Sequence, residues 1–185
     1  MSAGIFALII LNLTLMGLLP RIFFRQDGSF NLMWWLTAAP FFLVSAVVAL
    51  FYFQVLALPW GAAFQAVREM LAAAFSATSI GLMSFTLGTH RRRLSLWHQN
   101  NDAPEEIVTY GAYKRIRHPF YTSFMLAMVS TVLLCPSIWT LALSLYSILM
   151  LNHTAAGEER KLSASAFGET YRTYIGQTGR FLPKF

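Results

Sequence analysis

The chain has 185 residues, of which 56% are hydrophobic and only 12% are charged, with 14 basic residues against 8 acidic ones. A soluble domain carries about 25% charged residues, so this composition excludes an ordinary water-soluble globule and favours a membrane protein. The basic residues flank apolar segments and form no stripe interleaved with aromatic residues, which argues against a nucleic-acid partner.

Five apolar segments approach or exceed the roughly 20 residues that a helix needs to cross a membrane. They cover residues 3–20, 32–58, 63–89, 119–134 and 137–153. Pro40 predicts a kink in the second segment, and a neighbouring helix must then bond the carbonyl that the proline leaves without a donor. Small residues in the third segment predict close helix packing. The last two segments are short and predict a helical hairpin over residues 119–153.

The polar segments predict how the chain is threaded. A polar segment covers residues 90–118, and the residues after 153 predict one or two amphipathic helices that end near Gly176. With five crossings, every Lys and Arg except Arg68 falls on one side of the membrane. The positive-inside rule makes that side cytoplasmic, so we predict a cytoplasmic C-terminus and an N-terminus outside.

The expected fold is therefore an all-α, polytopic integral membrane protein with about five transmembrane helices and cytoplasmic C-terminal amphipathic helices. We treat residues 1–185 as a single domain, with three spans in residues 1–89 and the polar motifs in residues 90–185. A Rossmann domain is not expected, because no G-x-G-x-x-G motif joins a strand to a helix. Cys135 is the only cysteine, which excludes an intrachain disulfide and a multi-cysteine metal site, and no metal is expected.

Two polar clusters lie on the predicted cytoplasmic side. One is EEIVTYGAYKRIRHPFY, residues 105–121, and the other combines GEERKL with FGETYRTY, residues 157–174. Most of these residues, taken singly, fit a structural explanation, since basic residues anchor headgroups and Pro119 suits the first turn of a helix. His118 differs, because an imidazole that enters a membrane segment is costly without a partner. Glu158 or Glu159 could supply that partner across the hairpin.

The ordered set G-x-Y, R-H-P-x-Y, a Glu-Glu pair and F-G-x-x-Y-x-x-Y resembles the isoprenylcysteine carboxyl methyltransferase (ICMT) family and its phospholipid methyltransferase relatives, over residues 105–183. The resemblance implies a membrane methyltransferase of the EC 2.1.1 class that uses S-adenosyl-L-methionine and acts on a lipophilic acceptor. The acceptor group would be a carboxylate, a thiol or an amine. The implied cofactor contacts are Glu105, Glu106, Ile107, Val108, Tyr113, His118, Pro119, Phe120, Tyr121 and Glu158, with His98 as a weaker candidate.

These residue types suit a zwitterionic sulfonium compound. Its amino group needs an acceptor such as Glu158 or Glu159, its carboxylate needs a cation such as His118 or a neighbouring arginine, and its adenine needs an apolar slot. Methyl transfer displaces a carbon that the positive sulfur already activates, so the protein must mainly align the acceptor and exclude water. A general base is optional, and we assign no catalytic residue.

The sequence also departs from the family pattern. Ser123 stands where glycine is common. Prenylcysteine enzymes carry an arginine one turn before the Glu-Glu pair, and Thr154 beside His153 occupies that place, which argues against a prenylcysteine acceptor. His153, Thr154 and Glu159 are the candidates for acceptor contacts. We expect Tyr171 and Tyr174 to pack against headgroups, and residues 180–183 to form a lid or an anchor.

Two other function classes are open to this sequence. An NADPH-dependent membrane reductase of the sterol type shares a similar histidine motif and tyrosine-rich tail, and the run RRRLSLWHQN, residues 91–100, could bind a ribose phosphate. A non-enzymatic membrane scaffold is the third class. Membrane lipids are partners in every case, and the sequence leaves the acceptor and the oligomeric state open.

Overall fold

The computed structural model describes residues 1–18, 23–25, 27–57, 64–89 and 106–184. This described part contains six α-helices and a short 3-10 helix, η1, but no strand, which confirms the all-α prediction. The elements are α1 (Ala3–Leu18), α2 (Leu32–Tyr52), α3 (Gln65–Thr89), η1 (Gly111–Lys114), α5 (Pro119–Leu134), α6 (Ile138–Ser163) and α7 (Gly168–Gln177).

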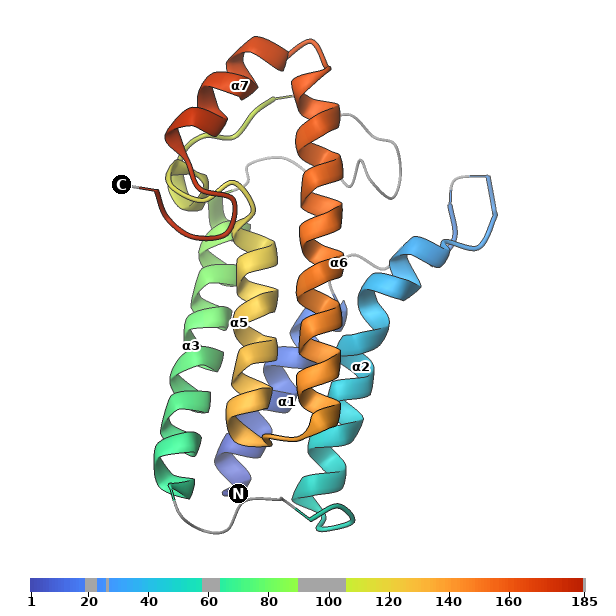
Figure 1. The fold of residues 1–185 in the computed structure, drawn as a ribbon, viewed down its shortest axis with the longest axis vertical. Helices are drawn as coiled ribbons and strands as arrows, with labels where there is room; N and C mark the ends of the chain where they lie inside the picture. Colours follow the sequence, from blue (N-terminus) through green and yellow to red (C-terminus); the bar gives the residue numbers. More distant parts are fainter. Residues whose placement is uncertain (19–22, 26, 58–63, 90–105, 185) are drawn as a thin grey trace.

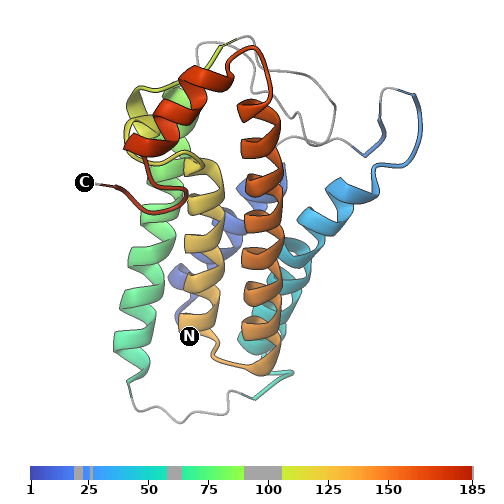
Figure 2. The same cartoon turned by 45° about the horizontal axis from the view of Figure 1, so that its top comes forward.

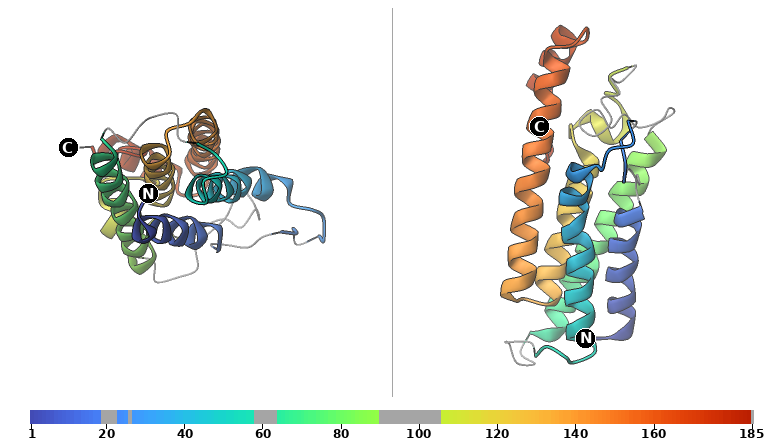
Figure 3. Two further views of the ribbon diagram at one scale, coloured as in Figure 1. Left: turned by 90° about the horizontal axis from the view of Figure 1, so that it is seen from below. Right: turned by 90° about the vertical axis from the view of Figure 1, so that its right-hand side faces the viewer.

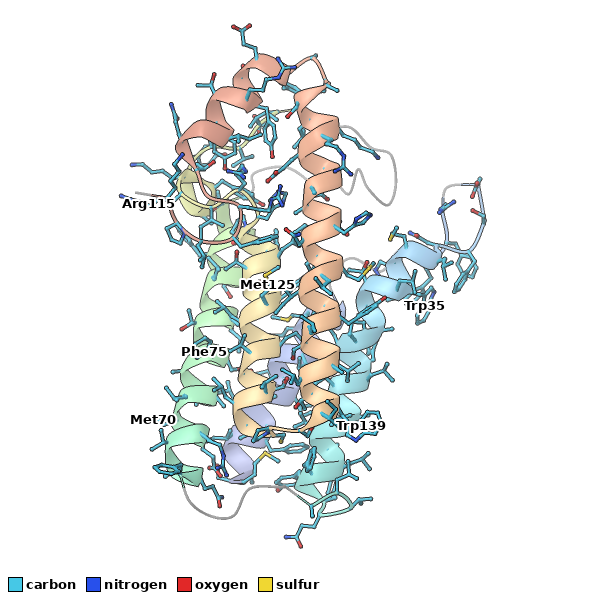
Figure 4. The ribbon with its side chains drawn as sticks, viewed as in Figure 1. Trp35, Met70, Phe75, Arg115, Met125 and Trp139 are labelled. Atoms are coloured by element: carbon cyan, nitrogen blue, oxygen red, sulfur yellow. The ribbon has the colours of Figure 1, made fainter. Side chains whose placement is uncertain are left out.

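The long helices form a bundle in which successive helices run in opposite directions (Figure 1). The helix α5 packs against α1, α2, α3 and α6, and Figure 3 shows this arrangement from below and from the side. The N-terminus lies at the lower end of the bundle, whereas η1, α7 and the C-terminal tail lie together at the upper end. Polar side chains, Arg115 among them, gather at that upper end, and Met70 and Trp139 lie toward the lower one (Figure 4).

Three of the helices are long and apolar enough to cross a membrane: α2, α3 and α6. The apolar helices α1 and α5 have 16 residues each and are shorter than an independent span requires. These helices support an integral membrane protein with transmembrane helices. The count of five crossings and the orientation of the termini stay predictions.

The helix α2 continues through Pro40, and its N-terminal part leans away from the bundle (Figure 1). Proline has no N–H to donate to the carbonyl four residues earlier, which is that of Leu36. The Tyr146 hydroxyl of α6 donates to this carbonyl at 3.1 Å, so a neighbouring helix satisfies it as the sequence predicted. The predicted end of this helix at residue 58 is wrong, because the amides of residues 53–56 turn back onto carbonyls of residues 49–51.

The small residues of α3 serve packing within the chain. Its buried residues recur every three or four positions and form one stripe, and α3 packs closely along α5. On the α1 side of α3, a polar seam forms where the Asn12 amide donates to Ser76 Oγ at 2.9 Å. Across the interface with α5, Ser79 Oγ donates to the Ser123 carbonyl at 2.7 Å. The position where the family pattern favours glycine therefore lies in a close, hydrogen-bonded contact between α3 and α5.

The prediction that the hairpin ends near residue 153 is also wrong. The hairpin itself exists, since α6 begins at a capping box formed by Ser137 and Thr140 directly after α5. However, α6 runs without a break to Ser163, because residues 154–162 contain neither proline nor a glycine in a left-handed conformation to end it. The acidic pair therefore lies on a continuous helical extension of the hairpin, near the upper end of α5.

Candidate functional site

Two local devices set the path of the chain into α5. Gly111 has a φ of +59°, and a side chain there would lie 2.4 Å from Thr89 Oγ1, so only glycine fits this turn against the end of α3. Pro119 occupies the first turn of α5, where its missing N–H has no consequence. His118, which precedes Pro119, therefore occupies the N-cap position of α5, and it is buried.

His118 lies between the two glutamates of α6. Its Nε2 is 3.2 Å from Glu159 Oε1, and its Nδ1 is 3.5 Å from Glu158 Oε2. The side chains of His118 and Glu159 are 8% and 9% exposed, so the contact is almost closed to solvent. The structure thus brings the histidine motif and the acidic pair together across the hairpin.

Two tyrosines complete the surroundings of Glu158. The Tyr121 hydroxyl donates to Glu158 Oε1 at 2.9 Å, and the Tyr121 ring lies parallel to the His118 ring with centroids 5.3 Å apart. Tyr113, in η1, lies close enough to Glu158 for the carboxylate charge to affect the Tyr113 pKa. Burial, with smaller contributions from Tyr174 and Glu158, raises the pKa of Tyr113 above its ordinary range. This corner therefore combines a carboxylate with neutral phenols and an imidazole.

Glu159 has a different set of partners. Arg117 Nε donates to Glu159 Oε1 at 2.9 Å, and Arg180 Nη2 donates to Oε2 at 2.6 Å. Arg180 Nε also reaches Oε1 at 3.1 Å. Because Glu159 and Arg117 are buried, the charges must compensate each other locally. Sequence reasoning named only an unspecified arginine near His118, and it missed the part that Arg180 takes.

The C-terminal tail lies against the histidine motif through its backbone. Arg117 donates its amide to the Gly179 carbonyl at 2.8 Å, His118 donates to the Arg180 carbonyl at 3.1 Å, and Gly179 donates to the Arg115 carbonyl at 3.1 Å. Ile116 and Gly179 form an isolated parallel β-bridge. The tail therefore packs onto the segment that precedes α5, at the place where α7 folds over the bundle (Figure 2).

The tyrosines of α7 are buried inside the protein. Tyr171 and Tyr174 are 3% and 7% exposed, and the Tyr174 hydroxyl donates to the Tyr113 carbonyl at 2.6 Å. The expectation that both pack against headgroups is wrong. The reason is that α7 folds back over η1 and the histidine motif, so its apolar face covers protein. Burial raises the pKa of Tyr174 to about 12, although Arg117 and Thr178 oppose this shift.

The other predicted residues are spread more widely. Pro119 is buried at the start of α5, and Phe120 packs against the hydrophobic core. Ile107 and Val108 are half-buried and Glu106 is exposed, outside the hydrogen-bonded cluster around His118. Glu105, His98 and the run of residues 91–100 lie outside the described residues.

The candidates for acceptor contacts divide in the same way. Thr154 is buried, His153 is exposed, and Glu159 belongs to the charged cluster. Next to His153, the Asn152 side chain accepts a hydrogen bond from Arg180 Nη1 at 2.9 Å. The guanidinium of Arg180 therefore lies along the α6 face that carries positions 152 and 159, two helical turns apart.

A hollow of about 670 Å³ opens beside α7, lined by Thr109, Lys114, Glu169, Thr170, Thr173, Tyr174, Gln177 and Thr178. It contains neither His118 nor Glu158. We assign the candidate site to the His118 cluster, because oppositely charged and aromatic side chains converge there, whereas the hollow is open and most of its lining side chains are exposed.

Comparison with known families matches residues 79–164 to the model of the isoprenylcysteine carboxyl methyltransferase (ICMT) family. Neither curated proteins nor solved structures yielded a match. The matched segment begins within α3 and ends just after α6, so it contains His118 and both glutamates, whereas α7 and the tail lie beyond it. The predicted resemblance to the ICMT family is therefore confirmed over residues 79–164 of this membrane protein.

Proposed function

We propose that the chain is an integral membrane methyltransferase that transfers a methyl group from S-adenosyl-L-methionine to a lipophilic acceptor, a carboxylate, a thiol or an amine. The observation that carries the proposal is the position of His118 between Glu158 and Glu159, with 3.5 Å and 3.2 Å contacts. A buried cluster of titratable groups at the end of a membrane helix is a typical place for a functional site.

The side chains around Glu158 fit the chemical groups of this cofactor. The Glu158 carboxylate is 17% exposed, more than that of Glu159, and suits an ammonium or a sulfonium. The imidazole of His118 can donate to a carboxylate. The aromatic faces of Tyr113 and Tyr121 suit the adenine, since both rings lie near Glu158. Glu105, Glu106, Ile107 and Val108 complete the proposed set on the segment that leads into η1.

The cofactor supplies a methyl group that a positive sulfur activates for displacement. The chain's own side chains would hold and orient the cofactor. Glu158 provides a fixed negative charge, Tyr121 and His118 restrict its rotation, and the cover of α7 and the tail limits access of water. An acceptor that arrives as an anion needs no proton removed, so we assign no general base.

The lipophilic acceptor would reach the site from the bilayer, while the cofactor would come from water. The site lies at the upper end of the bundle. The predicted topology makes this end cytoplasmic and places the N-terminus outside. The same proposal treats residues 1–185 as one domain whose C-terminal half, residues 90–185, binds the cofactor. His153 and Thr154, one turn before Glu158, are the proposed neighbours of the acceptor.

Calorimetric titration of detergent-purified protein with S-adenosylhomocysteine and, separately, with NADPH tests the reaction class. We expect binding of the first compound and none of the second. His118→Ala and Glu158→Ala should each abolish the binding, whereas His153→Ala, which removes an exposed histidine of the same helix, should leave the cofactor affinity intact. Binding of NADPH alone would instead favour the membrane reductase.

Incubation of membranes with a methyl-labelled cofactor then tests for transfer. We expect a labelled lipid-soluble product, identified by mass spectrometry, that is missing when Glu158→Ala protein is used. Binding of S-adenosylhomocysteine without any labelled product from protein in its own membranes would contradict the proposed transfer and favour a scaffold that retains the pocket.

A further inference from the structure

We infer that Arg180 is a positioning residue for this site and that the tail around it, residues 178–182, is a working part of the site. Arg180 fixes the Glu159 carboxylate in the orientation in which Glu159 contacts His118. The inference rests on the proposed function, because it concerns the same cofactor-binding cluster. It extends that function to a segment beyond the family match.

Arg180 contacts both carboxylate oxygens of Glu159. Arg180 Nη2 lies 2.6 Å from Glu159 Oε2, and Arg180 Nε lies 3.1 Å from Oε1. A guanidinium that contacts both oxygens of a carboxylate fixes its plane as well as its charge. Arg180 Nη1 bonds Asn152 Oδ1 at 2.9 Å, so the guanidinium itself is held along α6.

The other arginine cannot take over this role. Arg117 reaches Glu159 through Oε1 alone, and its Nη1 donates to the carbonyls of Ile175 and Thr178. Arg180 is the described side chain that bonds Oε2. If Arg180 were removed, Oε2 would lose its donor. Arg117 and His118 would then hold the carboxylate through Oε1 alone, which leaves its plane less fixed relative to His118.

The backbone keeps Arg180 in register with the histidine motif. His118 donates its own amide to the Arg180 carbonyl at 3.1 Å, and the Thr122 hydroxyl donates to the Phe181 carbonyl at 2.9 Å. Gly179 allows the tail to turn there, because a side chain at this position would lie 1.9 Å from the Leu182 carbonyl oxygen. The same tail residue therefore bonds both His118 and the carboxylate that His118 contacts.

The test compares three tail variants: Arg180→Gln, Arg180→Lys and Lys184→Gln. Lys184→Gln is the matched control, because Lys184 carries the same charge in the same tail but bonds the Gly176 carbonyl. We expect Arg180→Gln to weaken S-adenosylhomocysteine binding about ten- to a hundredfold, the range of a lost charge-assisted hydrogen bond. Arg180→Lys should recover part of the loss, and Lys184→Gln should stay within about twofold of the wild type.

A double-variant cycle separates positioning from general stability. In a Glu159→Gln background, Arg180→Gln should have little further effect on affinity, because the group it positions is already altered. Additive losses in the cycle, or equal affinities of Arg180→Gln and Lys184→Gln, would overturn the inference. If Arg180→Gln does not fold, Arg180→Lys and Lys184→Gln still decide, since the inference requires the first to bind more weakly.

Failure of the proposed function gives a different result. Wild-type protein would then bind no S-adenosylhomocysteine, and amide exchange would carry the test. The amides of Arg117 and His118 are bonded to the tail, so they should exchange faster in Arg180→Gln than in Lys184→Gln. Equal exchange in the two variants would show that Arg180 does not hold the tail against the histidine motif.

Discussion

The membrane bundle and the upper end of the molecule are held by different kinds of polar contact. In the bundle, hydroxyl groups mostly bond carbonyls of their own helix, such as Thr86 with Leu82 and Ser147 with Leu143. At the upper end, charged side chains join residues far apart in the chain, such as Arg117 and Glu159, which are 42 residues apart.

The difference follows from the environment of each region. In a bilayer every polar group must find a partner close by, and short hydroxyl side chains do this within one helix. The upper end can hold charges, because arginines and glutamates there are paired and partly reached by water. The bundle therefore tolerates neutral polar changes, whereas the upper end depends on a few long-range ion pairs.

If the upper end depends on its ion pairs more than the bundle does, then the loss of one ion pair should destabilise the upper end strongly. Arg117→Ala leaves Glu159 with fewer partners and removes the bonds to the carbonyls of Ile175 and Thr178. We expect it to destabilise the protein by about 3 kcal/mol or more, the range for breaking a buried pair. The thermal midpoint and the rate of tryptic cleavage near α7 measure this. Arg160→Ala, which removes an exposed arginine next to Glu159 in α6, is the control and should change little.

Gly111→Ala tests the junction between the two regions. Its new methyl group would lie 2.4 Å from Thr89 Oγ1, at a φ of +59° that disfavours a side chain. We expect a cost of about 2 kcal/mol from the combined strain and overpacking, measured by thermal unfolding. Thr89→Ala in the same protein should recover part of the loss. If Gly111→Ala is as stable as the wild type in thermal unfolding, then α3 and η1 are not in close contact.

A change in the bundle should have a smaller effect. Asn12→Leu removes the polar seam between α1 and α3 but leaves the bond from Ser79 to the Ser123 carbonyl. We expect a loss of about 1 kcal/mol, since hydrogen bonds between membrane helices contribute little on average. Denaturation in mixed detergent micelles measures it, and cofactor affinity should not change. An effect as large as that of Arg117→Ala would abolish the distinction between the regions.

The smallest effect concerns Tyr174 and alkaline pH. Burial raises the pKa of Tyr174 to about 12 in the folded protein, against about 10 in an unfolded chain. Its contribution to stability is therefore complete below pH 10 and is lost as the pH rises toward about 12. Ultraviolet absorbance of tyrosinate should show several late-titrating groups, because burial also raises the pKa of Tyr113 and of Tyr171, and Tyr174→Phe should remove the one that titrates near pH 12. The variant should also lose about 1 kcal/mol with the hydrogen bond to Tyr113. If the variant titrates like the wild type, then Tyr174 is not the tyrosine that titrates near pH 12.

The sequence by itself predicted the apolar helices and the two motifs that meet. Apolar runs, Pro119 and the capping residues Ser137 and Thr140 act within a few positions of themselves, so α5 and the start of α6 follow from local rules. The cost of an unpartnered imidazole also predicted that His118 would contact the acidic pair. These features depend on residue type and spacing, which the sequence contains.

Only the tertiary structure decided which arginine meets which carboxylate. Arg115, Arg117, Arg172 and Arg180 all stand in polar segments with similar flanks, and no local rule ranks them as partners of Glu159. The choice follows from the uninterrupted extension of α6, the fold of α7 over η1 and the return of the tail along residues 115–118. The physical reason is that an ion pair depends on the distance between side chains in space. Arg117 and Arg180 are 42 and 21 positions from Glu159 and come close to it only when the whole bundle has formed.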